Sequence, residues 1–423
     1  MAYGREVHSV FGPSVRGAPL LRTSGCAKLR DLRSLVDAPS WRRELGRLDH
    51  GRAGPTLLVL AGIHGNEPAG VVAVQRVLSE LQQHETAVRG RIIALAGNLP
   101  GLAASARYLA RDLNRGWLPA AIAALQERDP ATDSAEDAQQ RELLARFEEV
   151  VHTARGPVVF LDLHTSSADG PPFLCLADTM DNRDLALATG VPIILGIEET
   201  IDGASLEWFT GKGIVAIAAE GGRHQHPDTV GNHEALLWSV LAHLGMVEAS
   251  EVQAERHRAH LSRATAGVPP IVEIVHRHAI SAEDRFVMAP GYVNFQRVRK
   301  GDLLAVDRRG EIRAEQDCRM LLPLYQALGD DGYFLARPVR AFWLGVARWL
   351  RWMRLDRIVH WLPGVRRDPE DALTILVDPI IARWFVTEIF HLLGFRRLRR
   401  RGARLAFSRR WSRPENRQLG RTR

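Results

Sequence analysis

Two short motifs in this chain contain residue types that can bind a catalytic metal ion. His64 and Glu67 come directly after an apolar run, and His164 ends a second apolar run that starts at Val158. Imidazole nitrogens and a carboxylate are ordinary zinc ligands, and a catalytic zinc site uses three protein ligands and keeps a fourth position open for water. These residue types predict a hydrolytic site with His64, Glu67 and His164 around one zinc ion per chain, although the same donors suit other divalent metals.

A third apolar run ends in Glu220, which two glycines follow. A carboxylate opposite the metal can act as a general base: it takes a proton from water as that water attacks a carbonyl, and it passes the proton to the leaving amine. Glu220 is the residue that we expect in this role.

Other polar residues near these motifs have more than one interpretation. Asp162 is two positions before His164 and therefore on the same face of a strand, where it either orients that histidine or caps a neighbouring loop. Three further histidines could be ligands in principle but rank below His64 and His164, because glycine-rich loops often carry solvated histidines: His224, His226 and His233.

The elements that must position these residues are apolar runs alternating with helix-like stretches. The runs are apolar at consecutive positions, as expected of strands covered on both faces in a mostly parallel sheet, and they span residues 56–63, 91–96, 158–163, 192–195 and 213–219. Apolar residues recur at helical spacing in residues 69–83, 135–152 and 232–244. We therefore expect a three-layer α/β domain over residues 51–247, with the metal ligands and the base at the carboxyl edge of its sheet.

Length and composition are those of a globular protein. The chain has 423 residues, enough for two or three domains, and 46% of them are hydrophobic and 25% charged. Cys26, Cys175 and Cys318 are far apart and form no CxxC motif, so neither a disulfide framework nor a cysteine zinc site is expected. A reducing compartment fits this cysteine usage, and the first residues show no apolar segment of a secretory signal. A cytoplasmic location is the expectation.

Changes in amino-acid composition along the chain indicate further structural regions. Residues 1–50 are interpreted as a lead-in segment with one short polar helix, and residues 248–268 as a helix or linker. Residues 269–338 predict a β-rich domain, with strand-like pieces at residues 271–276, 285–287, 291–298, 302–306 and 310–312. Residues 340–423, rich in arginine and tryptophan, are expected to form a helical basic extension.

Charge is distributed unevenly between the extension and the rest. The net charge is +7, yet residues 340–423 contain 20 Arg, no Lys and 7 acidic residues, so the preceding residues are net acidic and do not resemble a nucleic-acid surface. Asp378, Arg383 and Glu388 interrupt the apolar stretch 373–393, which argues against a bilayer span. We interpret the extension first as packing on the body or forming a homo-oligomer, then as peripheral to a membrane, and last as binding nucleic acid through residues 396–401.

Four motifs occur in an order that resembles the succinylglutamate desuccinylase/aspartoacylase family, whose members have a zinc carboxypeptidase-like fold. They are His-Gly-Asn-Glu at 64–67, Arg-Tyr-Leu-x-x-Asp-Leu-Asn-Arg at 107–115, Asp-Leu-His-Thr at 162–165 and Ala-Glu-Gly-Gly-Arg-His at 219–224. The resemblance covers about residues 55–335. It implies that His64, Glu67 and His164 bind zinc and that Glu220 is the base. It also implies that Arg107 polarises the scissile carbonyl and that Asn114 and Arg115 hold a substrate carboxylate, as a guanidinium fork can do.

The chain departs from the family pattern at some positions. Arg223 stands where many relatives have Gln, so it either adds a second cation for substrate or faces solvent. The β-rich region resembles the second domain of the family, which partly covers the entrance of the active site. Tyr333 is similar to a tyrosine that contacts substrate in aspartoacylases, and the alternative is an aromatic residue of the core or rim.

These observations predict a zinc-dependent hydrolase that cleaves the amide bond of an N-acyl amino acid or a related small amide with a carboxylate. A first alternative is a metallocarboxypeptidase acting on peptides, which would need an open cleft rather than a covered entrance. A second alternative is a non-catalytic protein that associates with a membrane or with nucleic acid through its basic extension. Loss of a ligand or of Glu220 would have favoured this last alternative, and all four residues are present.

Overall fold

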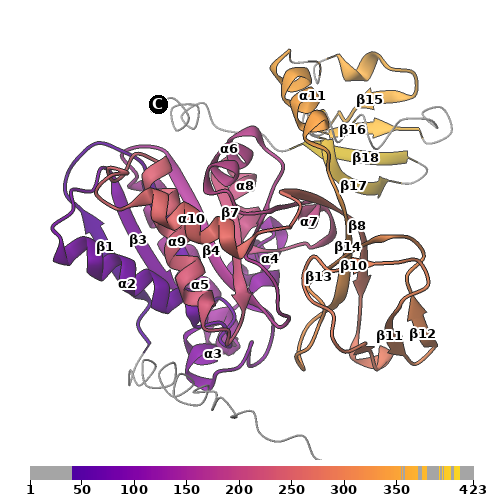
Figure 1. Ribbon diagram of the computed structural model, residues 1–423, viewed down its shortest axis with the longest axis horizontal. Coiled ribbons are helices and arrows are strands. Elements are labelled where there is room, and N and C mark those ends of the chain that lie inside the picture. Colours follow the sequence, from indigo (N-terminus) through magenta and orange to yellow (C-terminus); the bar gives the residue numbers. More distant parts are fainter. Residues whose placement is uncertain are drawn as a thin grey trace, which may run out of the picture. The chain divides into compact units, whose positions relative to one another are not determined.

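The computed structural model describes residues 41–353, 355, 358–369, 374–378, 390, 393, 395–401 and 404–409. Its largest feature is a mixed β-sheet that continues from the N-terminal α/β region into the β-rich region (Figure 1). Across this sheet the strands are β1 (Glu44–Asp49), β3 (Arg91–Ala96), β2 (Thr56–Ala61), β4 (Val158–Ser166), β7 (Val215–Arg223), β5 (Phe173–Leu176), β6 (Ile193–Leu195), β8 (Ile271–Ala279), β14 (Asp331–Pro338), β13 (Cys318–Leu321) and β10 (Arg297–Val298).

The centre of the sheet is parallel. Strand β2 pairs in parallel with both β3 and β4, and β4 pairs in parallel with β7. Strands β2, β3 and β4 are buried along their whole length, because helices cover both faces and the consecutive apolar residues meet helix side chains on each side. The parallel α/β core that the sequence predicts is confirmed, whereas the short strand β5, which runs antiparallel to β7, was not predicted.

The helices of the α/β region are α2 (Ala69–Gln83), α3 (Leu99–Ala104), α4 (Pro119–Glu127), α5 (Ala135–His152), α6 (Met180–Thr189), α7 (Ile197–Thr200), α8 (Ser205–Gly211), α9 (Asp228–His243) and α10 (Ala254–Ala264). Helices α2 and α9 pack on each other and on strands of the central sheet, and α10 packs on α9 (Figure 1). Helix α10 lies within residues 248–268, which the sequence analysis interpreted as either a helix or a linker.

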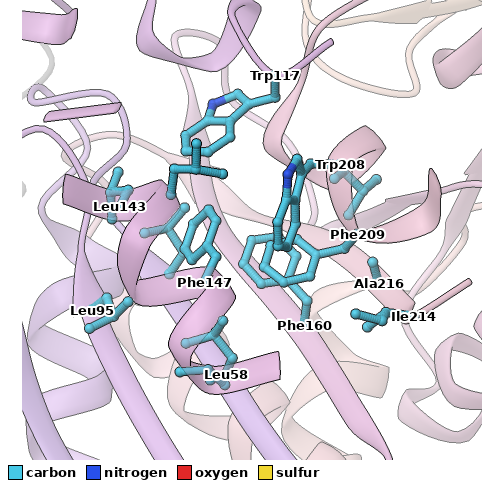
Figure 2. Packing of buried hydrophobic residues seen from close by; sticks show 14 of the residues in the cluster. Leu58, Leu95, Trp117, Leu143, Phe147, Phe160, Trp208, Phe209, Ile214 and Ala216 are labelled. Atoms are coloured by element: carbon cyan, nitrogen blue, oxygen red, sulfur yellow. The ribbon is translucent and has the colours of Figure 1, made fainter. Parts of the chain in front are cut away.

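A cluster of aromatic residues fills the opposite face of the sheet. Phe160 of β4 stacks on Phe209 of α8 with ring centroids 3.8 Å apart, and Phe147 of α5 lies 4.9 Å from Phe209 (Figure 2). These rings are fully buried, together with Trp117. Because β4 carries Asp162 and His164 at its carboxyl end, this packing fixes the strand that presents both residues.

Strands β8 and β14 join the α/β region to the β-rich region. Strand β8 pairs in parallel with β6 and antiparallel with β14, so one continuous sheet crosses from the first region into the second. A second, smaller sheet contains β12 (Gly310–Arg313), β11 (Leu303–Asp307) and β9 (Val287–Met288). The β-rich character of residues 269–338 is confirmed, while the division of the chain into separate domains stays a prediction.

The first residues that the structure describes differ from the expected lead-in. Strand β1 pairs antiparallel with β3 at the edge of the large sheet, so residues 44–49 are part of the α/β region. The buried side chain of Arg43 adds to this attachment by donating to the carbonyl groups of Ala96 and Gly97. The short helix expected within residues 1–50 is not found in residues 41–50, and residues 1–40 lie outside the described residues.

Among its described residues, the extension contains strands as well as helical residues. Helix α11 (Ala341–Trp352) agrees with the prediction, but β15 (Val365–Arg367), β16 (Thr374–Val377), β18 (Arg404–Arg409) and β17 (Phe395–Arg401) form an antiparallel sheet that the sequence analysis missed. Val377, Phe390 and Phe407 are buried in its small core. Strand β16 pairs with β18, which is distant in the sequence, and a local reading cannot detect this pairing. None of the described helices is long and apolar enough to cross a bilayer, and most of the apolar stretch 373–393 lies outside the described residues.

Candidate metal centre

The ends of β2, β4 and β7 bring the predicted site residues to one edge of the sheet. In the parallel register Ala61 pairs with Leu163, and His164 pairs with Glu220. His64 follows β2 by three residues, so its side chain and those of His164 and Glu220 share the carboxyl edge, where open α/β sheets bind ligands. The expectation that the three apolar runs end side by side is confirmed.

Gly65 allows the loop after β2 to pack closely on a neighbouring segment. Its amide donates to the carbonyl of Arg107 over 3.1 Å, and a Cβ atom at this position would lie only 1.9 Å from the carbonyl carbon of Gly101. A residue with a side chain would therefore push the loop away. The amide of Glu67 donates to the carbonyl of His64 over 3.1 Å, and this turn directs both side chains to the same place.

The donor atoms of His64, Glu67 and His164 converge. Each residue offers one donor within 4.8 Å of the others, and all three side chains are buried. Nδ1 of His64 lies 2.8 Å from Oε1 of Glu67, and Nδ1 of His164 lies 3.2 Å from Oε2 of the same carboxylate. Two imidazoles and one carboxylate at this spacing fit a divalent metal ion with an open coordination position.

Two further carboxylates face the other nitrogens of these histidines. Nε2 of His64 lies 3.2 Å from Oδ1 of Asp112, and Nε2 of His164 lies 3.2 Å from Oδ2 of Asp162. Burial lowers the pKa of His164, but Asp162 and Glu67 outweigh it and hold that pKa well above its usual value. Carboxylates in such positions fix the ring orientation and tautomer of metal-binding histidines.

Glu220 stands beside these residues on the adjacent strand. Its Oε2 atom has no hydrogen-bond partner among the residues that the structure describes. Burial, together with the nearby Glu67 and Asp162 carboxylates, raises the pKa of Glu220 to about 8, although His164 and Arg107 act in the opposite direction. A carboxyl group with a raised pKa and an uncommitted oxygen is suited to proton transfer near neutral pH.

Arg107 lies between two of the carboxylates. One of its terminal nitrogens is 2.9 Å from Oδ2 of Asp112, and the other is 3.5 Å from Oε1 of Glu67. The guanidinium is largely buried and lines the same pocket as Glu220. It therefore presents a fixed positive charge next to the three converging donors.

Asn114 and Arg115 lie at a different part of the pocket. Oδ1 of Asn114 accepts a hydrogen bond of 2.7 Å from the amide of Ser205, so this side chain ties the start of α8 to the loop that carries Arg115. A terminal nitrogen of Arg115 is 3.4 Å from Oδ2 of Asp331, and a quarter of the side chain is exposed. Both residues line the pocket.

Tyr333 is not in the pocket. Its side chain is 2% exposed and its ring stacks on His278 at 4.9 Å, within the core of the β-rich region. Burial raises the pKa of Tyr333 to about 12. The neighbouring Phe334 lines the pocket instead, because successive residues of a strand point to opposite faces. The role of Tyr333 as a substrate contact is therefore not retained, and the alternative of a core aromatic fits the structure.

The remaining polar residues of the motifs have other surroundings. Arg223 is exposed and pairs with Asp169 over 3.0 Å, in agreement with the solvent-facing alternative. Nδ1 of His224 lies 2.6 Å from Oγ1 of Thr165, and its Nε2 lies 3.1 Å from Oε1 of Gln326. His226 is exposed and His233 is buried beneath Gly221, and neither belongs to the converging donors.

The pocket has a volume of about 180 Å³ and is bounded by both regions of the chain. Gln326, Asp330 and Phe334 approach it from the β-rich region. The sequence analysis missed the apolar residues that line it and missed Asp112. The sequence signal for Asp112 was its place in the motif of residues 107–115, where its carboxylate caps a short turn by accepting a 2.8 Å hydrogen bond from the amide of Asn114.

Comparisons with known proteins agree with the resemblance seen in the sequence. Residues 53–210 match the model of the succinylglutamate desuccinylase/aspartoacylase catalytic domain. The succinylglutamate desuccinylase of Photorhabdus laumondii is 35% identical over 68 residues, which are 16% of this chain and 21% of that protein. The succinylglutamate desuccinylase of Burkholderia pseudomallei is 32% identical over 113 residues, which are 26% of this chain and 31% of that protein.

These matches span about a fifth to a third of the curated relatives. Among solved structures, a succinylglutamate desuccinylase/aspartoacylase from Rhodobacter sphaeroides is 21% identical, with a TM-score of 0.48, and the match covers 69% of this chain and 87% of that one. The matched residues 53–210 include His64, Glu67 and His164, whereas Glu220 and the β-rich region follow them.

Proposed function

We propose that this chain, whose residues 53–210 belong to the succinylglutamate desuccinylase/aspartoacylase catalytic-domain family, is a zinc-dependent hydrolase of N-acyl amino acids or related small amides with a carboxylate. The observation that carries the proposal is the convergence of His64, Glu67 and His164 within 4.8 Å, with Glu220 on the next strand. The cleaved bond would be the carbon–nitrogen bond of the amide.

The donors fit a zinc ion in number and in type. His64 and His164 would bind through the nitrogens that face Glu67, because their other nitrogens already face Asp112 and Asp162. When bound there, the ion would supply a Lewis acid that lowers the pKa of water and polarises a carbonyl oxygen. An N–H of Thr165 donates to Oε2 of Glu67 over 2.8 Å and helps to orient this carboxylate.

Glu220 and Arg107 supply the proton transfer and the charge stabilisation in this proposal. Glu220 takes a proton from the attacking water on its uncommitted Oε2 atom and later gives it to the leaving nitrogen. The guanidinium of Arg107 stabilises the negative charge that develops on the carbonyl oxygen, and its contacts with Asp112 and Glu67 hold it in place before the substrate arrives.

Arg115 anchors the carboxylate of the substrate in this proposal. Its planar fork of donors suits bidentate binding of a carboxylate, and its partial exposure leaves donors available on the pocket side. Asn114 would act beside it by holding the loop to α8. A fixed carboxylate places the amide bond at a set distance from Glu220, which lowers the entropic cost of the reaction.

The covered pocket supports a small substrate over a peptide. Leu322, Gln326 and Asp330 come from the β-rich region and line the same pocket as Glu220. Gln326 also receives a hydrogen bond of 3.0 Å from Asn66, which lies within the loop that carries the metal ligands. A long peptide would need this side to be open, so the metallocarboxypeptidase alternative is disfavoured.

Metal content and hydrolysis test the proposal together. Full-length protein should bind about one zinc ion per chain by elemental analysis, and His164→Ala should lose it while His226→Ala, which changes an exposed histidine outside the site, should keep it. Zinc-loaded protein should release free amino acid from a panel of N-acyl amino acids, and Glu220→Gln should lower kcat by about 10²–10⁴ while zinc stays bound. Folded wild-type protein that binds no zinc, or that hydrolyses no member of the panel, would refute the proposal.

A further inference from the structure

We propose that the amino acid released from the substrate has an apolar side chain and a single carboxylate, rather than the second carboxylate of aspartate or glutamate. This inference rests on the proposed function for the placement of the substrate carboxylate at Arg115. It adds the chemical class of the side chain, which follows from the residues that surround Arg115.

The positive charge of Arg115 is available to pair with one carboxylate of the substrate. Asp331 lies 3.4 Å from Arg115, but the other oxygen of Asp331 is 2.5 Å from Nε of Arg277. Arg277 also donates to the carbonyl of Thr200, which holds it on the far side of Asp331. Two guanidinium groups therefore share one carboxylate, so Arg115, Arg277 and Asp331 together carry a net positive charge next to the pocket.

The segment that follows Thr200 packs against the backbone of the loop that carries Arg115. The carbonyl of Gly203 accepts a hydrogen bond of 3.0 Å from the amide of Trp117, and a Cβ atom on Gly203 would lie 2.2 Å from the carbonyl oxygen of Arg115. Two residues later, the amide of Ser205 donates to Asn114. This segment is thus held against the loop that carries Arg115 at Gly203 and at Ser205.

This segment contributes apolar side chains to the pocket. Ile201, Ala204 and Leu206 line it, and Ala218 and Cys175, which are register partners on β7 and β5, line it next to them. We call these five residues the apolar wall. A substrate whose carboxylate is held at Arg115 has its amino-acid side chain adjacent to that carboxylate, and therefore against the apolar wall.

A second carboxylate on the substrate would find no suitable partner there. Among the described residues that line the pocket, Arg107 and Arg115 are the only arginines and there is no lysine. Arg107 already contacts Asp112 and Glu67, while Glu207 and Asp330 add further carboxylates to the lining. Burying an unpaired carboxylate against apolar side chains carries a large desolvation cost, so acidic amino acids should be rejected strongly.

The first test compares kcat/KM values of zinc-loaded, full-length protein for four substrates. N-acetyl-L-leucine and N-acetyl-L-phenylalanine should be hydrolysed at least about 100-fold more efficiently than N-acetyl-L-aspartate and N-succinyl-L-glutamate, because an unmatched buried charge discriminates more than a missing methylene does. Equal or better hydrolysis of the two acidic substrates would overturn the inference and leave the proposed function intact.

A matched pair of variants tests whether the apolar wall is responsible. Ile201 is partly exposed at the C-terminal end of α7, so Ile201→Lys can place an ammonium group at the wall without burying it fully. This variant should raise kcat/KM for N-acetyl-L-aspartate relative to N-acetyl-L-leucine by at least about tenfold. The control Ile201→Met keeps an apolar side chain of similar volume and should keep the order of the wild type. If the ratio of the kcat/KM values for N-acetyl-L-aspartate and N-acetyl-L-leucine is unchanged in folded Ile201→Lys, the apolar wall does not determine the choice of substrate.

A binding measurement separates this inference from the proposed function. Calorimetry on the Glu220→Gln variant should show tighter binding of N-acetyl-L-leucine than of N-acetyl-L-aspartate, whether or not turnover occurs. Preferential binding of the leucine compound, together with hydrolysis of no member of the N-acyl amino acid panel by the wild type, would refute the hydrolase and retain the apolar pocket. Binding of neither compound at millimolar concentration would refute the inference as well.

Discussion

Replacing Asp162 with asparagine tests whether the second layer of carboxylates controls the metal site. Oδ2 of Asp162 lies 3.2 Å from Nε2 of His164 and accepts a hydrogen bond of 2.7 Å from Oγ of Ser205. The side chain is 1% exposed, and its Oδ1 atom has no partner among the described residues. The negative charge of Asp162 therefore acts mainly on His164, and Asp162→Asn removes this charge while keeping the shape.

The expected loss follows from this geometry. Removing a carboxylate behind a metal-binding histidine typically weakens metal binding by about 10–100-fold, which corresponds to about 1.4–2.7 kcal/mol. Within the part of the chain that the structure describes, Asp162 pairs with no cation besides His164, so Asp162→Asn should lie in the upper half of this range. Asp112 is different, because Arg107 also contacts it at 2.9 Å and its loss would disturb the guanidinium as well.

The assay is competition for zinc against a chromogenic chelator, with circular dichroism to confirm folding. Protonated His164 cannot bind metal, and Asp162 contributes to holding the pKa of His164 well above its usual value. Zinc affinity of the wild type should therefore rise with pH. Asp162→Asn should show weaker binding and a shallower rise, because its His164 loses its proton at lower pH.

Ser205→Ala is the matched control. It removes the hydroxyl that donates to the same oxygen of Asp162 but leaves the carboxylate, so zinc affinity should change by less than about threefold. Asp162→Asn that binds zinc as tightly as the wild type, with an unaltered pH dependence, would show that Asp162 does not orient His164. An effect of equal size in Ser205→Ala would assign the loss to packing around the start of α8 instead.

Three further predictions concern stability, each measured as the free energy of unfolding in urea. Burial raises the pKa of Asp137, but hydrogen bonds from Ser134 and Arg111 lower it to about 2. The ionised carboxylate therefore stabilises the fold above pH 4, and this stabilisation is lost as the pH falls towards 2. The wild type should be more stable than Asp137→Asn by about 1 kcal/mol at pH 7, and this difference should vanish between pH 4 and pH 2. Phe147→Ala should cost about 3–5 kcal/mol, because its ring packs within the central aromatic cluster. Arg351→Ala should cost about 1–3 kcal/mol, because it removes a buried contact of 2.9 Å to Asp178, whereas Arg183 still contacts that carboxylate. A cost within experimental error for either alanine variant, or an advantage at Asp137 that persists at pH 2, would contradict the corresponding argument.

The sequence was most informative where local signals and the global fold agree. The bounds predicted for the helices at residues 69–83 and 135–152 are those of α2 and α5. At the second helix the reason is a capping box, in which Ser134 and Asp137 satisfy each other's backbone amides. The carboxyl edge was predictable as well, because ligands bind at the carboxyl ends of parallel strands, and His164 and Glu220 are register partners near the carboxyl ends of β4 and β7.

Contacts across long sequence distances were not predictable. Asp112 contacts His64, which is 48 positions earlier in the chain, and the loop that carries Asp112 has no periodic pattern. The basic run at residues 396–401 was considered for nucleic-acid binding, but it forms β17, which pairs with β18, and β18 in turn pairs with the more distant strand β16. Arginine-rich composition describes side chains and leaves open which strand the backbone pairs with, and pairing decides the structure of this part of the chain.

The misplacement of Tyr333 and the missed apolar wall have one physical origin. A motif fixes a position along the chain, but in a strand the side-chain direction alternates, so Tyr333 enters the core while the next residue, Phe334, reaches the pocket. Ile201, Ala204 and Leu206 of the apolar wall carry no group that performs chemistry, and hydrogen bonds at Gly203 and Ser205 hold their segment against the loop that carries Arg115. Motifs can therefore indicate the reaction of this chain, whereas its choice of substrate depends on residues that only the folded backbone brings together.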